Sequence, residues 1–377
     1  MRDLLKKQGM QSLIASLLCI VLGLLLGYIV LLFINPGGAS QAILAVAKNF
    51  LNTTRANLQV KNFANTLAKS APLLMCALSI LFAYKVGLFN IGAAGQYVAG
   101  ACACLYSALA WGWSWLPCML FAIAVGALYG AIVGLLKAYC NVNEVISGIM
   151  LNWIGLYTAN MLLANVKEST SPYTVHLKDG APQAILPSLG LGKLFENNQY
   201  ITIAVPLAIV LAIVIMVILN KTRFGYELRA TGNNKNAAKY AGMAEKRNII
   251  LTLMIGGALA ALGASLLYQT DYMQWEVTAS SVPSMGFNGI AAAFLGGLNP
   301  IGTIFASYFI QHITDAGAFV DKTMYSSQIS DLISAIIIYL CGFVLFIKTT
   351  ISSGIARSEE RERRRKASAE AEKGGEA

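Results

Sequence analysis

Residues 86–136 read VGLFNIGAAGQYVAGACACLYSALAWGWSWLPCMLFAIAVGALYGAIVGLL and contain no charged side chain. A helix crosses the hydrocarbon core of a bilayer with about 20 mostly apolar residues, so this stretch is too long for one crossing. The cluster of Trp111, Trp113, Trp115 and Pro117 is the natural break, because tryptophan prefers the membrane interface and proline suits a first helical turn. The stretch therefore predicts two membrane-spanning helices.

The composition of the whole chain indicates the same class of protein. Of its 377 residues, 56% are hydrophobic and 12% are charged, against about 25% charged in an ordinary soluble domain. Lipid-facing surfaces avoid charge because a charged side chain is costly there. The formal net charge of +10 lies in short loops and tails and on no known nucleic-acid motif, so we expect membrane lipid and no nucleic acid as a partner.

The other apolar runs divide in the same way. We expect an all-α fold with about ten transmembrane helices in a transmembrane domain over residues 1–348, and a charged, disordered cytoplasmic tail over residues 349–377. Segments 283–299 and 300–318 meet at the breaker Gly296-Gly297-Leu298-Asn299-Pro300. They form either two full crossings or two broken or re-entrant half-helices inside the protein. The further expected spans cover residues 12–34, 67–84, 143–164, 200–219, 248–268 and 328–347.

Charge predicts the orientation of these spans. Residues 221–247 hold seven basic and two acidic side chains, which places them in the cytoplasm by the positive-inside rule. Ten crossings then put both termini in the cytoplasm and residues 165–199 outside. Residues 35–66 disagree, because they should be external yet carry Lys48, Arg55 and Lys61 with no acidic residue.

Two short segments resemble each other across the chain. Residues 87–94 read GLFNIGAA and residues 286–293 read GFNGIAAA. Both are rich in small residues, and each is expected to open an apolar helix. The match indicates a weak internal repeat, of the kind that places a central pathway at a repeat interface in many transporters.

Two further segments carry polar side chains inside apolar surroundings. Asn90 and Gln96 lie among small residues after Phe89, and an amide without a partner is costly in lipid. They face a ligand or water, or they join helices by hydrogen bonds in a glycine-rich seam. Glu144 and Asn152 share one face of the next expected helix. Glu144 is a candidate functional group, or else a helix cap or a partner for Lys137.

The basic segment holds a third candidate. Gly232, Asn233 and Asn234 predict a turn, and Asn236 to Ala241 predict a short amphipathic helix that Gly242 ends. A small-residue face of Ala237 and Ala238 beside the aromatic Tyr240 suits docking into a groove of a partner, whereas a solvated basic loop would not need it.

These segments resemble the permease subunits of bacterial ABC importers in the branched-chain amino acid and simple-sugar superfamily, closest to the nucleoside-uptake branch. The resemblance covers about residues 10–350 and rests on residues 89–96, 143–152, 232–242 and 296–302 in the family's order. Two positions depart from the pattern: Ala94 stands where the family usually has an acidic residue, and Gly148-Ile149 where Thr-Ile or Thr-Leu is common. Both departures bear on the choice of substrate.

The resemblance implies a multi-pass subunit of the bacterial cytoplasmic membrane that translocates a small polar solute, with nucleosides favoured. Its implied partners are ABC ATPase subunits, a second homologous permease and an extracytoplasmic substrate-binding lipoprotein. Since no GxxxxGK[ST] phosphate loop occurs, ATP hydrolysis is expected on a partner. We expect no catalytic residue, metal or cofactor. The implied coupling helix contains Gly232, Asn233, Ala237, Ala238, Tyr240 and Gly242, and the candidate pathway residues are Phe89, Asn90, Gln96, Glu144, Asn152, Trp153 and Asn288.

Other functions stay open at this point. A simple-sugar or branched-chain amino acid ABC permease would use similar polar residues. An ion-coupled carrier or channel that works without ATP would normally bury several ionisable residues in its spans, whereas Glu144, Asp315 and Asp331 lie near expected span ends.

Overall fold

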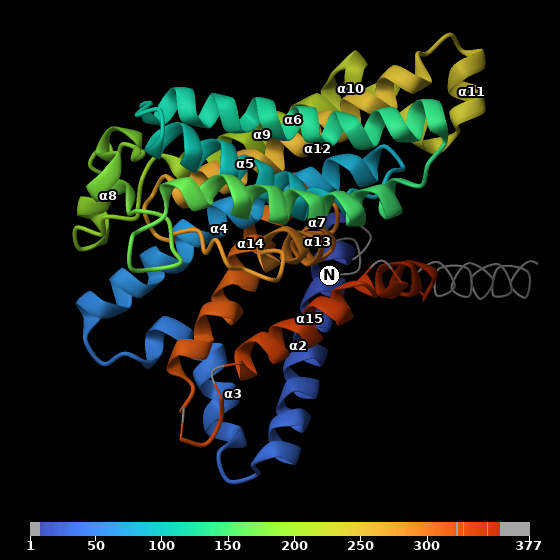
Figure 1. Cartoon of the computed structure of the whole chain (residues 1–377). Coiled ribbons are helices and arrows are strands. Elements are labelled where there is room, and N and C mark those ends of the chain that lie inside the picture. The colour runs from blue at the N-terminus through green and yellow to red at the C-terminus, as the bar shows by residue number, and fades with distance from the viewer. Residues whose placement is uncertain (1–7, 322, 327, 345, 355–377) are drawn as a thin grey trace, which may run out of the picture.

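The computed structural model describes residues 8–321, 323–326, 328–344 and 346–354, and helices make up most of this part of the chain (Figure 1). The elements are, in chain order, α2 (Gln8–Ile34), α3 (Ala39–Lys48), η1 (Asn49–Asn52), α4 (Ala56–Lys85), α5 (Ala93–Leu109), α6 (Trp115–Cys140), α7 (Glu144–Leu163), η2 (Ala164–Val166), α8 (Leu177–Gly180), η3 (Pro182–Ala184), η4 (Leu191–Phe195), α9 (Ala204–Lys221), α10 (Arg223–Asn233), α11 (Lys235–Tyr240), α12 (Glu245–Tyr268), α13 (Ser284–Leu295), α14 (Pro300–Asp315), η5 (Ala316–Phe319) and α15 (Ile329–Cys341).

Six helices in the described residues are long and apolar enough to cross a membrane, namely α2, α4, α6, α7, α9 and α12. The all-α expectation is confirmed, and so is the break in the opening stretch, because α5 ends at Leu109 and α6 begins at Trp115. Four more apolar helices, α5, α13, α14 and α15, have 17, 12, 16 and 13 residues. Each is shorter than the about 20 residues of a full crossing, so the count of ten stays a prediction.

Residues 35–66 are largely helical and not the loop that the sequence predicts. After the turn at Asn35, α3 and η1 follow, and α4 begins at Ala56, well before the expected residue 67. The reason is an apolar stripe, since Ala39, Ala42 and Val46 lie at helical spacing and are buried in the core.

The break before Pro300 has the same backbone form as the turn before α5. Gly297 and Gly87 both adopt positive φ angles, 66° and 76°. The next residue donates its amide back into the preceding helix in each case, Leu298 to Ala293 O (3.0 Å) and Leu88 to Ala83 O (3.0 Å). This is a helix C-terminal cap that glycine favours. The glycine conformation and the hydrogen bond therefore recur at 87–88 and 297–298, although Leu298 has a positive φ of 55° and Leu88 does not. Residues 286–293 of the expected match lie inside α13.

The main layer is held together by α12, which packs against α6, α4 and α5. In Figure 1 these helices run side by side with α7 and α9, while α2, α3 and α15 lie to one side of them. Along α6, Gly126 and Gly130 lie so close to α12 that a Cβ atom on either would overlap its backbone carbonyls at Gly257 and Leu253. Small residues at this spacing let helix backbones touch, which is how helices associate in lipid.

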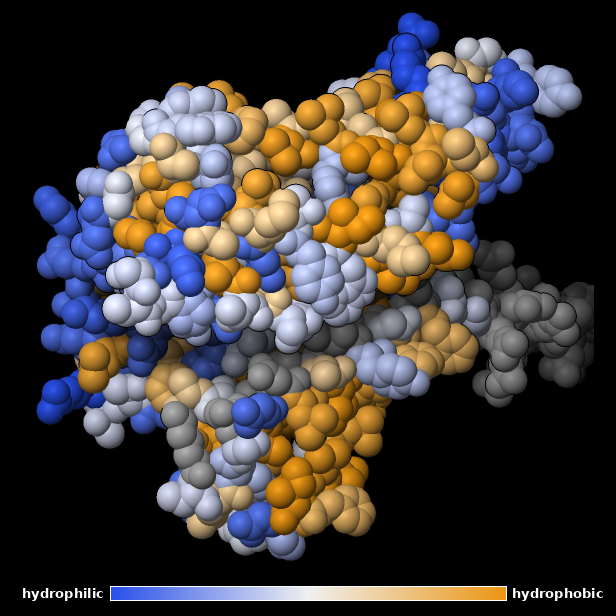
Figure 2. All heavy atoms as spheres, in the orientation of Figure 1, coloured by the Kyte–Doolittle hydropathy of each residue, from blue (hydrophilic) through white to orange (hydrophobic). Residues whose placement is uncertain are grey.

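On the face seen in Figure 2, hydropathy divides the surface into a middle and two ends. Figure 2 shows hydrophilic residues gathered at the end that carries α8 and at the end that carries α10 and α11, with hydrophobic residues between them. We call these the α8 end and the α11 end. Residues 346–354 are helical, beyond the expected domain boundary at 348, and residues 355–377 of the expected disordered tail lie outside the described part of the chain.

Replacing Gly130 with valine should separate α6 from α12. The added side chain would overlap the Leu253 carbonyl, and overpacking of this kind lowers the free energy of unfolding by about 1–3 kcal/mol. Thermal unfolding in detergent should therefore shift to lower temperature. Gly354→Val is the control, since a Cβ atom at Gly354 meets open space. Equal unfolding temperatures for the two variants would contradict the close seam.

Candidate functional site

The polar cluster at the start of α5 is closed on itself. Asn90 Nδ2 donates to Ser79 Oγ (2.9 Å) and to Gln96 Oε1 (2.8 Å), and Gln96 Nε2 donates back to Asn90 Oδ1 (3.1 Å). Asn90 is 2% exposed and Gln96 is 0% exposed. Two of the candidate pathway residues thus join α4 to α5 by hydrogen bonds, the alternative role that the sequence left open. Their contact with a solute stays a prediction.

Asn152 fastens this cluster to α7. Its Oδ1 accepts from the amide of Gly95 (2.7 Å), and its Nδ2 donates to the carbonyl of Ile91 (3.1 Å). The side chain therefore satisfies an amide of the first turn of α5 and a carbonyl just before it, groups that have no partner within a helix. Gly148 lies one turn earlier on α7 against Gly92, where a Cβ atom would come within 2.9 Å of the Gly92 nitrogen. A larger residue at 148 would move α7 away from this turn.

Glu144 and Trp153 lie elsewhere on α7. Glu144 Oε2 is 2.8 Å from Lys137 Nζ, which is the ion pair considered as the alternative to a pathway role, and the N-cap is Asn143. Trp153 is 43% exposed and stacks on Tyr157, with ring centroids 6.2 Å apart. Around them α7 exposes a continuous apolar face that also includes Ile146, Ile149, Met150, Ile154 and Met161.

The two remaining pathway candidates are partly exposed on the protein surface. Phe89 and Asn288 are half-buried, and Phe287 beside Asn288 is exposed. The two similar segments, residues 87–94 and 286–293, meet in space, because a Cβ atom on Gly286 of α13 would overlap Ala94 of α5. The structure thus brings the starts of α5 and α13 together.

The basic segment at the α11 end contains the expected short helix. Asn234 Oδ1 accepts from the amide of Ala237 (3.0 Å) and caps α11, and Gly242 follows its last turn with φ 79°. The expected turn at 232–234 is narrower than predicted, because Gly232 and Asn233 end α10 and only Asn234 leaves helical geometry.

The face that α11 exposes differs from the expected one. Ala238 is 4% exposed and packs against its own chain, whereas Tyr240 is 94% exposed and Ala237 is also exposed. The expected pair of docking alanines is therefore divided, since neighbouring residues on a helix point about 100° apart. A partner would meet Tyr240 and Ala237.

Gly232 connects this segment to the amide cluster. A Cβ atom on Gly232 would overlap the carbonyl of Val86, and one on Gly87 would lie 2.8 Å from the Gly232 oxygen. The end of α10 thus touches the turn that leads to Asn90. A second connection runs to α12, where Asn248 Nδ2 donates to Thr231 Oγ1 (2.9 Å). Neither contact was predicted from the sequence, because no local feature shows which distant backbone or side chain a residue touches.

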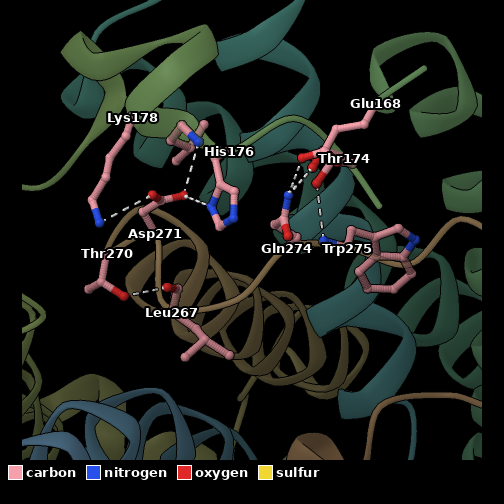
Figure 3. A network of polar contacts seen from close by, with 10 residues as sticks. Glu168, Thr174, His176, Lys178, Leu267, Thr270, Asp271, Gln274 and Trp275 are labelled. Atoms are coloured by element: carbon pink, nitrogen blue, oxygen red, sulfur yellow. Dashed lines mark hydrogen bonds and ion pairs between the residues drawn. The ribbon is translucent and has the colours of Figure 1, made fainter. Parts of the chain in front are cut away.

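At the opposite end, residues 165–199 are fixed to the segment after α12 (Figure 3). Asp271 is buried, and its Oδ1 accepts from the Leu177 amide (2.9 Å) and lies 3.2 Å from His176 Nδ1. Lys178 Nζ lies 3.7 Å from Asp271 Oδ2. Nearby, the Trp275 amide donates to Thr174 Oγ1 (3.1 Å). The α8 end therefore carries a folded cap instead of a loose loop.

The family model described as the branched-chain amino acid transport system permease component matches residues 62–342. No solved structure matched the chain.

Three curated relatives are similar over much of their length. The nucleoside ABC transporter permease protein NupB of Lactococcus lactis subsp. cremoris (strain MG1363) is 30% identical over 93% of this chain and 96% of its own. The guanosine ABC transporter permease protein NupP of Bacillus subtilis (strain 168) is 29% identical over 87% and 92%. The glucose ABC transporter permease protein TsgB13 of Haloferax volcanii is 28% identical over 72% and 73%.

Replacing Asn152 with leucine should destabilise the fold more than it changes solute affinity. The variant leaves the Gly95 amide and the Ile91 carbonyl buried without a partner, at about 1–3 kcal/mol each. Thermal unfolding of this variant should shift to lower temperature. The control is Asn165→Leu, at an exposed position of η2 directly after α7, which should leave the unfolding temperature unchanged. An unchanged unfolding temperature with a large rise in transport KM would contradict this structural role.

Proposed function

This chain belongs to the family of branched-chain amino acid transport system permease components, the membrane subunits of ABC importers, and from that premise we propose that it carries nucleosides across the cytoplasmic membrane. The observation that supports nucleosides is coverage. The relatives named for nucleosides and guanosine align over 93% and 87% of this chain, against 72% for the relative named for glucose.

A permease component of an ABC importer is not itself catalytic. ATP is therefore hydrolysed by a partner, and substrate is delivered by a binding protein. We propose a second permease of the same family as a further partner, either identical or homologous. The exposed apolar face of α7, with Trp153 stacked on Tyr157, is available for such a contact.

The proposed orientation places the α11 end in the cytoplasm together with both termini. Its basic residues outnumber its acidic ones, as the positive-inside rule requires of a cytoplasmic loop. The α8 end, with its folded cap, then faces outward and meets the binding protein.

The proposed coupling route begins at Tyr240. An ATPase that binds the exposed face of α11 would move α10, and Gly232 at the end of α10 lies against Val86 and Gly87. The turn they form leads to Asn90, whose hydrogen bonds join α4 and α5. Motion of the ATPase would thus reach the contact of α4 with α5 and switch the permease between outward-facing and inward-facing states.

A simple sugar is the second candidate substrate. The relative named for glucose, at 28% identity, supports it, and the half-buried pathway candidates Asn288 and Phe89 suit a sugar as well as a nucleoside. Substrate competition separates the two candidates.

Uptake by the assembled complex should be specific for nucleosides. In proteoliposomes loaded with ATP, unlabelled uridine should compete with labelled guanosine, whereas ribose and leucine should leave guanosine uptake unchanged. Measured initial rates decide the substrate. Uptake of ribose or leucine without any nucleoside uptake would overturn the proposal.

Tyr240→Asp should abolish substrate-stimulated ATP hydrolysis by the complex. Tyr240, the aromatic residue of α11, is 94% exposed, and a buried aspartate at a subunit interface is unfavourable. The readouts are ATPase rate and co-purification of the ATPase subunit. Tyr226→Asp on α10 is the matched control, because Tyr226 is also an exposed tyrosine of this segment. Normal stimulated turnover in Tyr240→Asp would exclude α11 as the docking helix.

A further inference from the structure

A polar cavity lies near the α8 end, between the start of α4 and the end of α14. Its volume is about 350 Å³, within the range of about 300–1,000 Å³ that small-molecule sites occupy. It contains none of the residues that the sequence proposed for the pathway. Its walls are Asn49, Asn62, Asn65, Thr66, Lys69, Tyr272, Thr314, Asp315, Gly317, Ala318 and Phe319.

One wall is a polar stripe on α4. Asn62, Asn65, Thr66 and Lys69 follow one another at the spacing i, i+3, i+4 and i+7, which places them on one face of the helix. From Ala71 to Ala83 every residue of the same helix is buried. A stripe of amides on a helix that then enters the protein core is unusual, because polar groups in a membrane helix generally face a partner or water.

The side-chain amides of Asn62 and Asn65 leave different atoms available to a ligand, an acceptor on one and a donor on the other. Asn62 Nδ2 donates to Thr53 Oγ1 (3.3 Å), and no hydrogen bond among the described residues uses its Oδ1. Asn65 Oδ1 accepts from Asn198 Nδ2 (2.8 Å), and within the same part of the chain its Nδ2 donates to nothing. The stripe therefore presents a free acceptor and a free donor one helical turn apart, the pairing that a nucleobase edge offers in complement.

The charges of the cavity cancel. Lys69 Nζ lies 2.8 Å from Asp315 Oδ1 and 4.7 Å from the centre of the Tyr272 ring, and Gln311 Nε2 donates to the same carboxylate oxygen (3.0 Å). Because both charges are already paired, the cavity has no surplus charge for an ionic ligand. A neutral, polar molecule matches it better than a free amino acid.

Phe319 supplies a flat apolar face. Phe319 is the last residue of η5 and lines the cavity, and its ring makes no aromatic contact within the described residues. Tyr272, by contrast, is covered by Lys69 and packs edge-on against Tyr200 at 4.7 Å. Aromatic faces of this kind stack on bases, and such stacking contributes about 1–3 kcal/mol per base in other proteins.

We propose that this cavity is an outward-facing binding site for a neutral nucleoside, in which Phe319 stacks on the base while Asn62 and Asn65 hydrogen-bond its edge. The inference rests on the proposed function and adds a site to it. The cavity adjoins the folded cap, since Asn198 binds Asn65 and Tyr200 contacts Tyr272. A solute released at the α8 end would therefore reach it first.

The test uses the full complex in proteoliposomes, with labelled guanosine and uridine as probes. Asn62→Leu and Phe319→Leu should each raise KM about tenfold, the effect of losing one hydrogen bond or one stacking face. Phe319→Tyr should keep KM close to that of the unmodified chain. The matched controls are Asn57→Leu, on an exposed position of α4, and Phe305→Leu, on the exposed face of α14.

The outcomes separate the site from the function. If the unmodified complex takes up no nucleoside, the proposed function fails. If uptake occurs and both cavity variants retain the KM of their controls, the site is overturned while the function stands. A phospholipid seen bound by native mass spectrometry, lost in Asn62→Leu with nucleoside KM unchanged, would overturn the site in favour of lipid. Asn62→Leu decides the question if Phe319→Leu does not fold.

Discussion

The contact of α6 with α12 is the constraint on which the rest of the structure depends. In lipid the side chains of a helix gain little by leaving their solvent, so helices associate through close packing and polar contacts. Here Gly126 and Gly130 bring the two backbones together at Gly257 and Leu253. With α12 held in this position, its other faces pack α4 and α5. The polar cluster joins those two helices, because Asn90, in the turn between them, bonds Ser79 of α4 and Gln96 of α5. Its geometry therefore depends on the glycine seam.

Polar groups inside the protein obey a second constraint, which is that each must find a partner. Asn90, Gln96 and Asn152 meet it among themselves and with backbone groups. They therefore rigidify the contact of α4, α5 and α7, and a moving solute would have to break those bonds to use them. Asn62 and Asn65 differ, because each leaves one amide atom available. Amides that look alike in the sequence thus divide into internal connectors and candidate ligand groups.

Local features of the sequence predicted much of the fold. The tryptophans before Pro117 mark the turn between α5 and α6, and Asn234 and Gly242 bound α11 nearly as expected. The ion pair of Glu144 with Lys137 was within reach too, because the two residues are close in the chain. Long-range pairing was not predictable: Lys69 and Asp315 are 246 positions apart. The inward direction of Ala238 depends on what α11 packs against, which periodicity over six residues cannot specify.

The contact between Gly232 and Gly87 has a mechanical consequence. Side chains that meet at an interface can change rotamer, and such changes absorb part of any displacement. Two backbones in direct contact have no side-chain rotamers between them. A displacement of α10 would therefore move the turn before α5 by nearly the same distance. Glycine at these two positions keeps the two backbones in contact. Any larger residue there would place a flexible side chain between them, and part of the displacement would be lost in its rotamer changes.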